Sequence, residues 1–399
     1  MRYVLIVGGE LFNKGAQAMT FALIQEIKRR YSDKEIILLS TDDYKRKQSE
    51  KELYGFRILP WNRKMVFSLA FYGGGILCKF LPGAQYINET KELRKILKDT
   101  DVIYDINGYA LSSQFGSQMS YLYLLNIKIA KKNNIKMYLL PQSFGPFNYD
   151  GIHNYLLNRL IKKYMKYPIK VFAREKDGIK CLENKISNNL VKSYDLVLHT
   201  SEPDEKLIYK KSNNDQYIKI IDNSIAIVPN MQTIRHGSKI KLFKLYYEII
   251  NTLLEQNMNI YLISHSYEDT QLCKEIKENY KSINKVVLID KELSCFQYNK
   301  IVSKFNFIIS SRYHAIIHAY KKGTPAIVFG WAIKYKELLE TFEQSKFLFD
   351  VRDSINLESV IDSIEDMNKN LSFYKSTIIK HYNKIREDDI LNQHGVFNI

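Results

Sequence analysis

The chain has 399 residues, too many for one ordinary hydrophobic core, and this length predicts two domains of about 150–200 residues each. Hydrophobic residues make up 45% of it and charged residues 26%, which excludes a disordered or collagen-like chain. Lysine and arginine outnumber aspartate and glutamate by 59 to 43. The resulting charge favours an anionic partner, either a nucleic acid, an anionic membrane surface or a phosphorylated substrate. Because the basic residues are scattered along the sequence, we do not expect nucleic-acid binding.

The cysteines and the first residues of the chain indicate the cellular compartment in which the protein works. Cys78, Cys181, Cys273 and Cys295 lie far apart without a C-x-x-C pair, which argues against a structural zinc site or a disulfide scaffold and fits a reducing compartment. The segment 1–7 enters an apolar strand at once and is too short for a secretory signal. We therefore expect a cytoplasmic protein that uses no metal.

Strands and helices alternate along the first half of the chain, a pattern typical of a parallel sheet covered on both faces. The predicted strands are Arg2–Val7, Glu35–Ser40, Asp101–Ile106, Ile135–Leu140 and Lys170–Ala173, and residues 192–198 close this half. The predicted helices are Gly15–Tyr31, Glu92–Leu97, Gln118–Lys132, Tyr155–Tyr167 and one that begins near Lys176.

An apolar stretch, Met65–Leu81, interrupts this alternation directly after Arg63 and Lys64. It is short for a bilayer span, and its three consecutive glycines would weaken a membrane helix. Two alternatives remain: a buried loop–helix insertion, or an interfacial segment that dips into a membrane surface beside the basic residues.

The second half repeats the alternation after a polar connection at residues 201–222. The predicted strands are Ser224–Val228, Asn259–Ser264, Lys285–Ile289, Phe307–Ser311 and Ala326–Phe329. The predicted helices are Lys241–Glu255, Gln271–Tyr280, Gln297–Ser303, Ala315–Lys321 and Tyr335–Phe342. We therefore expect a GT-B-like α/β architecture of two Rossmann-like domains, 1–200 and 223–399, whose parallel sheets face a central cleft, with the last helices able to pack back on the N-terminal domain.

Small and charged residues follow the first strand, in the run Gly8-Gly9-Glu10-Leu11-Phe12-Asn13-Lys14-Gly15. Glycines before a helix let backbone N–H groups approach an anion, and Lys14 adds positive charge beside Asn13. The run is not G-x-G-x-x-G, so we do not expect dinucleotide binding. It predicts either an anion site or a sharp turn without a ligand.

Polar side chains also follow later strands of the first half. Asn107 follows the third strand, and Gln142 and Ser143 stand in a proline-bounded loop, where they suit a polyol or an ordinary turn. Arg174 emerges at the end of a buried strand and needs a partner. We expect that partner to be a bound anion, the alternative being some carboxylate other than Glu175.

The most informative segment is Ile308–Ala315, in which a buried strand delivers Arg312 and His314 to the start of a helix. A permanently charged planar donor beside a side chain that titrates near neutrality suits an anionic substrate that undergoes proton transfer. The alternative is a helix-capping arginine with a core histidine. His265 ends another strand before two carboxylates, and Trp331 and Lys334 follow the last predicted strand, as in a sugar platform or simple packing.

In order and spacing these motifs resemble the polysaccharide pyruvyl transferase family. The resemblance rests on N-K-G-A-Q-A-M, P-Q-S-F-G-P, A-R-E-K-D, H-S-Y-E-D and S-S-R-Y-H-A followed by G-T-P-A-I. It implies a GT-B-like enzyme that transfers a pyruvyl group from phosphoenolpyruvate to sugar hydroxyls, usually as a cyclic ketal, with Arg174, Arg312 and His314 holding phosphoenolpyruvate. Some relatives carry a histidine where this chain has Gly145, so the proton donor is expected at His314 or His265.

We expect further substrate contacts from Asn13, Lys14, Asn107, Gln142, Ser143 and Lys334. No cofactor is expected beyond phosphoenolpyruvate as co-substrate. The acceptor would be a bacterial surface polysaccharide or its precursor on a polyprenyl diphosphate, which would place the enzyme in the cytoplasm or peripherally at the inner membrane. The alternatives are a GT-B glycosyltransferase that uses a nucleotide sugar and a catalytically silent anion- or nucleic-acid-binding protein.

Overall fold

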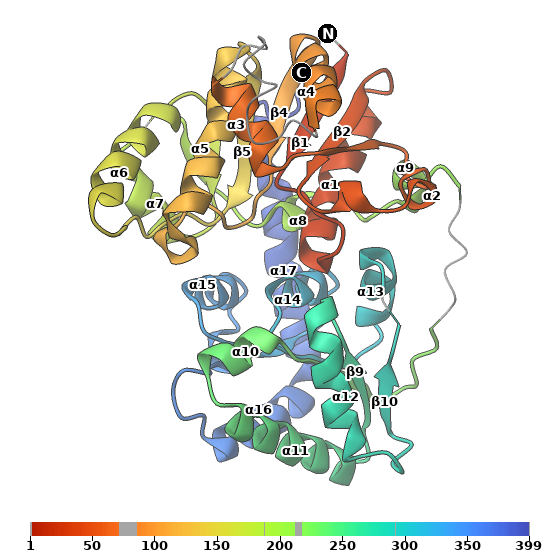
Figure 1. Cartoon of the computed structure of the whole chain (residues 1–399). Helices are drawn as coiled ribbons and strands as arrows, with labels where there is room; N and C mark the ends of the chain where they lie inside the picture. The colour runs from red at the N-terminus through yellow and green to blue at the C-terminus, as the bar shows by residue number, and fades with distance from the viewer. Residues whose placement is uncertain (1, 72–85, 187, 212–217, 292, 399) are drawn as a thin grey trace. The chain divides into compact units, whose positions relative to one another are not determined.

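A computed structural model of the chain describes residues 2–71, 86–186, 188–211, 218–291 and 293–398. Its contacts divide the chain into two compact α/β units, which Figure 1 draws with their elements labelled. Unit 1 comprises Met1–Leu11, Met19–Asn213 and Asp389–Ile399, and unit 2 comprises Phe12–Ala18 and Asn214–Asp388. The first turn of helix α1 (Lys14–Arg30) thus belongs to unit 2 and the remainder of that helix to unit 1.

The described part of unit 1 contains a seven-stranded parallel sheet in the order β3-β2-β1-β4-β5-β6-β7. Its strands are β1 (Tyr3–Val7), β2 (Glu35–Ser40), β3 (Arg57–Pro60), β4 (Thr100–Asp105), β5 (Lys136–Gln142), β6 (Lys170–Ala173) and β7 (Leu190–Lys192). The direction in which successive strands are added reverses between β1 and β4. In a doubly wound sheet, ligands bind beside the carboxyl ends of the strands at such a switch point.

Side chains of each strand alternate between two buried faces of this sheet. The first face packs against α3 (Arg63–Phe71), α4 (Ile87–Lys98), α5 (Gly116–Lys132), α6 (Ile152–Tyr164) and α7 (Lys176–Glu183). On the second face, Phe21 and Ile24 of α1 are buried, and the buried Tyr104 donates from its hydroxyl to the carbonyl of Val396 at 2.6 Å. The described residues 389–398 therefore complete the core of unit 1.

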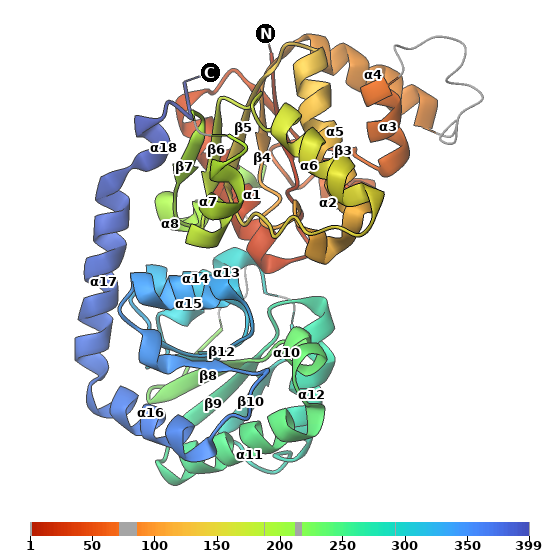
Figure 2. The ribbon, with the colours of Figure 1, turned by 90° about the vertical axis from the view of Figure 1, so that its left-hand side faces the viewer.

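The described part of unit 2 repeats this topology with six parallel strands, β10-β9-β8-β11-β12-β13. They are β8 (Ser224–Val228), β9 (Asn259–Ile263), β10 (Val286–Ile289), β11 (Ile308–Ser310), β12 (Ala326–Gly330) and β13 (Leu348–Asp350). The helices are α10 (Met231–His236), α11 (Lys239–Glu255), α12 (Thr270–Glu278), α13 (Cys295–Val302), α14 (Tyr313–Lys321), α15 (Ile333–Thr341), α16 (Leu357–Lys369) and α17 (Leu371–Asp388). Figure 2 shows α11 and α16 on one face of this sheet and α13 and α14 on the other. Its switch point lies between β8 and β11.

The connection between the halves differs from the prediction. Residues 201–211 belong to unit 1 and include helix α9 (Glu205–Ile208). Ile208 is fully buried, and the Tyr209 ring stacks on Tyr54 at 5.4 Å and meets Phe21 edge-on at 6.0 Å. These aromatic contacts pack residues 201–211 against unit 1, although the polar composition of this segment predicts a linker.

Two short edge strands were not predicted from the sequence, and the described part of the apolar insertion is helical. The sequence reading missed β3 and β13, and it did not separate β7 from helix α8 (Leu196–His199) at residues 192–198. Of the Met65–Leu81 stretch, residues 65–71 lie in α3, where Met65 and Leu69 are buried, and residues 72–81 lie outside the described residues. No helix in the described parts of the chain is both long and apolar enough to cross a membrane.

Candidate active site

The switch point of unit 2 brings together the segments that follow β8 and β11. Asn230 comes two residues after β8, and its side-chain amide donates to the carbonyl of Ser311 at 2.9 Å. Its Oδ1 accepts from the backbone N–H of Gln232 at 2.9 Å, which caps α10. The Tyr335 hydroxyl donates to the same Ser311 carbonyl at 2.9 Å. The backbone that delivers Arg312 is therefore held from two sides.

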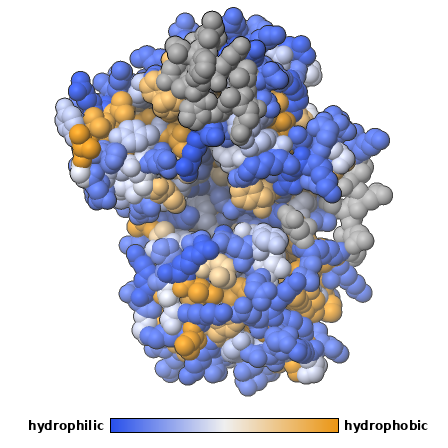
Figure 3. Space-filling model, viewed as in Figure 1, coloured by the Kyte–Doolittle hydropathy of each residue, from blue (hydrophilic) through white to orange (hydrophobic). Residues whose placement is uncertain are grey.

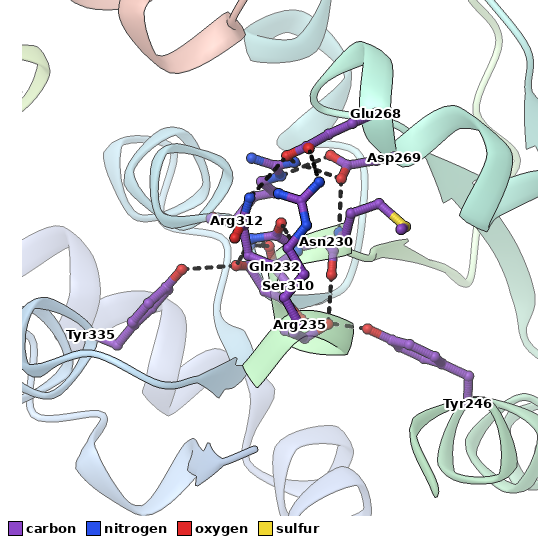
Figure 4. Close-up of polar contacts among 12 residues, drawn as sticks. Asn230, Gln232, Arg235, Tyr246, Glu268, Asp269, Ser310, Arg312 and Tyr335 are labelled. Carbon is purple, nitrogen blue, oxygen red and sulfur yellow. Dashed lines mark hydrogen bonds and ion pairs between the residues drawn. The ribbon is translucent and has the colours of Figure 1, made fainter. Parts of the chain in front are cut away.

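Arg312 is clamped by two carboxylates, as Figure 4 shows. Its Nε donates to Oδ2 of Asp269 at 2.7 Å, and its Nη2 donates to Oδ1 of Asp269 at 2.6 Å and to Oε1 of Glu268 at 2.8 Å. Arg235 donates to the other oxygen of Glu268 at 3.1 Å. A forked pair of this kind fixes the guanidinium plane. No described residue hydrogen-bonds to Nη1, so this nitrogen keeps its two donors for a ligand.

The charges of this clamp are set by burial and by the arginine together. Burial alone would lower the pKa of Arg312, but the hydrogen bonds and charges of Asp269 and Glu268 raise it. Burial would likewise raise the pKa of Glu268, yet hydrogen bonds and charge from Arg312 lower it. Asp269 is the most deeply buried of the three, and burial raises its pKa above the ordinary value despite the bonds from Arg312. The guanidinium thus remains charged and oriented.

His314 occupies the first turn of α14 and lies against the first turn of α1. A Cβ added to Gly15 would come within 2.2 Å of Nδ1 of His314. Asn13 positions this turn, since its Oδ1 accepts from the N–H groups of Gly15 at 2.9 Å and Ala16 at 3.3 Å. Lys14 is only 5% exposed. All these residues belong to unit 2. A glycine stands beside the histidine because any larger side chain would collide with its ring.

His265 is placed differently from His314. It is 3% exposed, and burial together with the positive charges of His318 and Arg312 holds its pKa well below the usual range. No described residue hydrogen-bonds to its Nε2, and the Tyr298 ring lies edge-on at 5.2 Å. A buried imidazole that stays neutral is a poor general acid. His265 is therefore a poor candidate for the expected proton donor.

Lys334 and Trp331 lie in an aromatic cluster of unit 2. The Lys334 ammonium sits 5.2 Å from the Tyr313 ring centre and 5.6 Å from that of Tyr335. Trp331 stacks on His236 at 5.3 Å. Lys334 therefore lies beside Tyr313, the residue before His314. One face of the Trp331 ring is covered by His236.

Arg174 forms a buried ion pair with Asp195 inside unit 1. Its Nη1 donates to Asp195 at 2.6 Å, and its Nη2 donates to the Gly108 carbonyl at 2.8 Å and to the Ser143 hydroxyl at 2.7 Å. The Arg174 side chain is 4% exposed and that of Asp195 is fully buried. The counter-charge that was expected from a bound anion is supplied by Asp195, as in the alternative of another carboxylate. Glu175, which was not expected to pair with Arg174, also lies 3.7 Å from its Nε. Arg174 ties together the segments after β4, β5, β6 and β7.

Asn107 and Gln142 surround a buried carboxylate at the switch point of unit 1. Asn107 donates to Asp105 from its backbone at 3.1 Å and from its side chain at 2.9 Å, and Gln142 donates to the same Oδ1 at 3.3 Å. Burial raises the pKa of Asp105 to about 6, although these amides counteract the shift. A carboxyl poised near neutrality at a strand end is a candidate functional group that the sequence reading passed over.

Glu10 was missed as well. Burial raises its pKa to about 7, helped by the neighbouring Asp43 and opposed by hydrogen bonds from Ser40 and Thr41. Asp43 is buried and accepts from the N–H of Leu11 at 2.7 Å. The signal was present in the sequence as an acid after each of the first two strands, but only the tertiary structure shows that they meet.

Gly145 occupies the position at which some relatives carry a histidine. Its φ is +78°, and a Cβ there would lie 2.5 Å from Sγ of Cys181. A larger residue at this position would need both a strained backbone and a displaced Cys181. The chain is therefore built for glycine at this position.

The expected site residues form two groups, each within its own unit. Unit 2 holds Asn13, Lys14, His265, Arg312, His314 and Lys334, and unit 1 holds Asn107, Gln142, Ser143 and Arg174. Asp195 was not predicted as a partner of Arg174, and Glu268 and Asp269 were not predicted as partners of Arg312. Within the described ranges, no three metal-binding side chains come together in a cluster.

Solved structures share this fold. UDP-GlcNAc 2-epimerase from Neisseria meningitidis bound to UDP-GlcNAc is 14% identical, with a TM-score of 0.57 and 100% of both chains covered. The S. aureus MnaA–UDP structure is 13% identical (TM-score 0.55; 94% of this chain and 91% of the other covered). Medicago truncatula UGT71G1 with UDP-glucose is 11% identical (TM-score 0.52; 97% and 98% covered). The predicted GT-B-like fold is confirmed.

The sequence itself has one family match. No curated protein matches the chain. The model of the family described as "Polysaccharide pyruvyl transferase" matches residues 13–333, a span that begins at Asn13 and includes Arg174, Arg312 and His314. Because this match covers most of the chain, the protein belongs to the polysaccharide pyruvyl transferase family.

Proposed function

We propose that the protein transfers a pyruvyl group from phosphoenolpyruvate to two hydroxyls of a sugar in a bacterial surface polysaccharide or its lipid-linked precursor, forming a ketal. The observation that carries the proposal is the pairing of Arg312 and His314 at the switch point of unit 2. Phosphoenolpyruvate concentrates a carboxylate and a phosphate in a small molecule, and a helix start with an oriented guanidinium suits such an anion.

The Nη1 edge of Arg312 is the proposed contact to the anion. Asp269 and Glu268 occupy the Nε and Nη2 donors, so the guanidinium binds with one edge while the opposite edge is held in place. Lys14 and Lys334 are proposed to add positive charge from the two sides of His314. These lysines would offset the negative charge that the two carboxylates bring to the site.

Proton transfer falls to His314. Donation from the imidazolium to the methylene carbon of phosphoenolpyruvate breaks the carbon–carbon π bond and develops positive charge at the adjacent carbon. A sugar hydroxyl adds to that carbon and gives up its proton. A second hydroxyl then displaces phosphate, so one phosphate leaves for each ketal formed. Arg312 would stabilise the charge on the departing phosphate.

The acceptor is assigned to polar groups at strand ends of unit 1. Ser143 and Asn107 are proposed to contact sugar hydroxyls, with Gln142 holding the Asp105 carboxyl beside them. Arg174 then acts as a positioning residue, because its Nη2 donates to the Ser143 hydroxyl. Its contribution to binding is indirect.

Incubation of the purified protein with phosphoenolpyruvate and a galactoside or mannosaminide acceptor tests the proposal. Acceptor-dependent phosphate release without any nucleotide sugar supports it, and the product should gain the mass of pyruvate less one water. The competing function is a GT-B glycosyltransferase, favoured by the nucleotide-sugar ligands of the structural neighbours. It requires release of nucleotide from a nucleotide sugar and no turnover of phosphoenolpyruvate.

A further inference from the structure

Three neighbouring helices of unit 1 form one outer layer on the sheet. Arg63 at the start of α3 donates to Gln118 of α5 at 2.8 Å, and Tyr121 of α5 hydrogen-bonds to His153 of α6 at 3.2 Å. Helix α5 therefore lies between α3 and α6. The outward sides of α3 and α6 face away from the core that their inward sides complete.

Those outward sides carry large apolar side chains. Phe67 and Phe71 of α3 are 47% and 50% exposed, and their rings lie 4.7 Å apart. On α6, Ile152 is 69% exposed, Tyr155 65% and Leu156 38%. Scattered exposed apolar residues are normal, but groups of them on the helices of one outer layer indicate an interaction surface. Figure 3 shows apolar side chains over α5 and α6 among hydrophilic ones.

The same three helices have an uneven charge. They contain no aspartate or glutamate, although the chain has 43 acidic residues. Their basic residues are Arg63, Lys64, Lys128, Lys131, Lys132, Arg159, Lys162 and Lys163. The fold therefore collects these lysines and arginines, which look scattered along the sequence, on three neighbouring helices that carry no acidic residue of their own.

On α6 the apolar and basic side chains share one side of the helix. Arg159 and Lys163 follow Ile152 by seven and eleven residues, spacings that return to the same face. Leu157 and Ile161, on the opposite side, are fully buried. We call this surface the apolar–basic face. It consists of Phe67, Phe71, Ile152, Tyr155, Leu156, Arg159, Lys162 and Lys163.

We propose that the apolar–basic face docks on an anionic phospholipid surface. A lipid interface accepts aliphatic and aromatic side chains below the headgroups and basic ones at their level, which matches both halves of the face. A second copy of the chain would bring lysines against lysines. A nucleic acid would satisfy the basic residues but offers little to Ile152 and Leu156. The helices would lie in the interface without crossing it.

This inference is independent of the proposed reaction and has its own readout. Co-sedimentation with phosphatidylglycerol vesicles should show binding at low salt that weakens at high salt, with much weaker binding to phosphatidylcholine vesicles. The triple variant Arg159→Gln/Lys162→Gln/Lys163→Gln should lose on the order of 100-fold in partitioning, about fivefold for each charge. The triple variant Ile152→Ser/Tyr155→Ser/Leu156→Ser should also release the protein.

A matched control lies in unit 2, where Ile240 is 83% exposed on α11 beside Lys241 and Lys244. The variant Ile240→Ser/Lys241→Gln/Lys244→Gln removes an apolar and two basic residues from outside the face and should bind vesicles like the wild type. All variants alter exposed side chains, and their unfolding midpoints should match that of the wild type.

Three results would overturn the proposal. One is wild-type vesicle binding by both triple variants of the face. Another is a wild-type dimer that dissociates in the serine variant while vesicle binding is absent, which would make the face a contact between copies. The third is salt-sensitive binding to RNA without binding to vesicles. Turnover of a soluble acceptor should be unchanged in the face variants, so loss of the proposed reaction would be seen separately.

Discussion

Gly15 packs against the imidazole of His314 so closely that a single added carbon at Gly15 would reach 2.2 Å from Nδ1. The two residues stand about 300 positions apart in the sequence, yet both belong to unit 2. The glycine thus sets the ring position of the proposed proton donor.

The variant Gly15→Ala should reduce kcat by about 100-fold, because a displacement of about 1 Å at a catalytic group costs this much. Phosphoenolpyruvate-dependent phosphate release measures it. Gly178→Ala is the control: a Cβ there would have its nearest neighbours at 3.5–3.7 Å, and alanine favours the helix. Equal rates in Gly15→Ala and the wild type would contradict the positioning role.

Removing Arg174 should destabilise unit 1. Arg174→Met leaves the buried Asp195 carboxylate uncompensated, which costs about 3–5 kcal/mol, measurable by urea unfolding. Adding Asp195→Asn should recover part of that loss, since the asparagine can still accept from the N–H of Val197, as Asp195 does at 3.0 Å. If Arg174→Met unfolded like the wild type but lost phosphoenolpyruvate binding, Arg174 would be a direct ligand.

The two carboxylates at Arg312 should contribute unequally. Asp269→Asn replaces the fully buried partner that takes both the Nε and Nη2 bonds, and it should lower kcat/KM for phosphoenolpyruvate about 100-fold through misorientation of the guanidinium. Glu268→Gln changes a carboxylate that is 34% exposed and should cost no more than about fivefold. Steady-state kinetics at fixed acceptor concentration compare them. The reverse order of effects would contradict the clamp.

Glu10 should make stability depend on pH. Its folded-state pKa of about 7 lies above the ordinary 4.5, so its contribution is present below pH 4.5 and is lost as pH rises to 7. The loss is about 3 kcal/mol in full burial, reduced to about 2 kcal/mol by partial solvent screening. Glu10→Gln should therefore gain stability over the wild type between pH 5 and 8 in urea unfolding. The exposed Glu52→Gln should keep the wild-type profile, and an unchanged profile in Glu10→Gln would rule out the assignment.

Strands that are buried on both faces could be predicted from the sequence because a continuous apolar run is a local pattern. Glu35–Ser40, Lys170–Ala173 and Ser224–Val228 are strands with the predicted bounds. The strands β3 and β13 were missed because these edge strands are only partly buried and lack such a run.

The candidate site was predictable in its positions but not in its pairings. Arg174 and Arg312 stand at strand ends, as expected. Their carboxylate partners lie 21 and 43 residues away along the chain, and such pairing depends on strand order, which no local pattern encodes. The apolar–basic face likewise combines side chains of α3 and α6, and only the folded chain shows that these two helices belong to one layer.

The most direct test of the central claim is turnover of phosphoenolpyruvate by the wild type, Arg312→Lys and His314→Gln with one sugar acceptor and no nucleotide sugar. The wild type should release phosphate only with the acceptor present and should form a ketal product. Arg312→Lys should bind phosphoenolpyruvate more weakly, because lysine cannot span the carboxylates and the anion together, and His314→Gln should lose kcat while it retains binding. Full activity in both variants, or activity only with a nucleotide sugar, would contradict it.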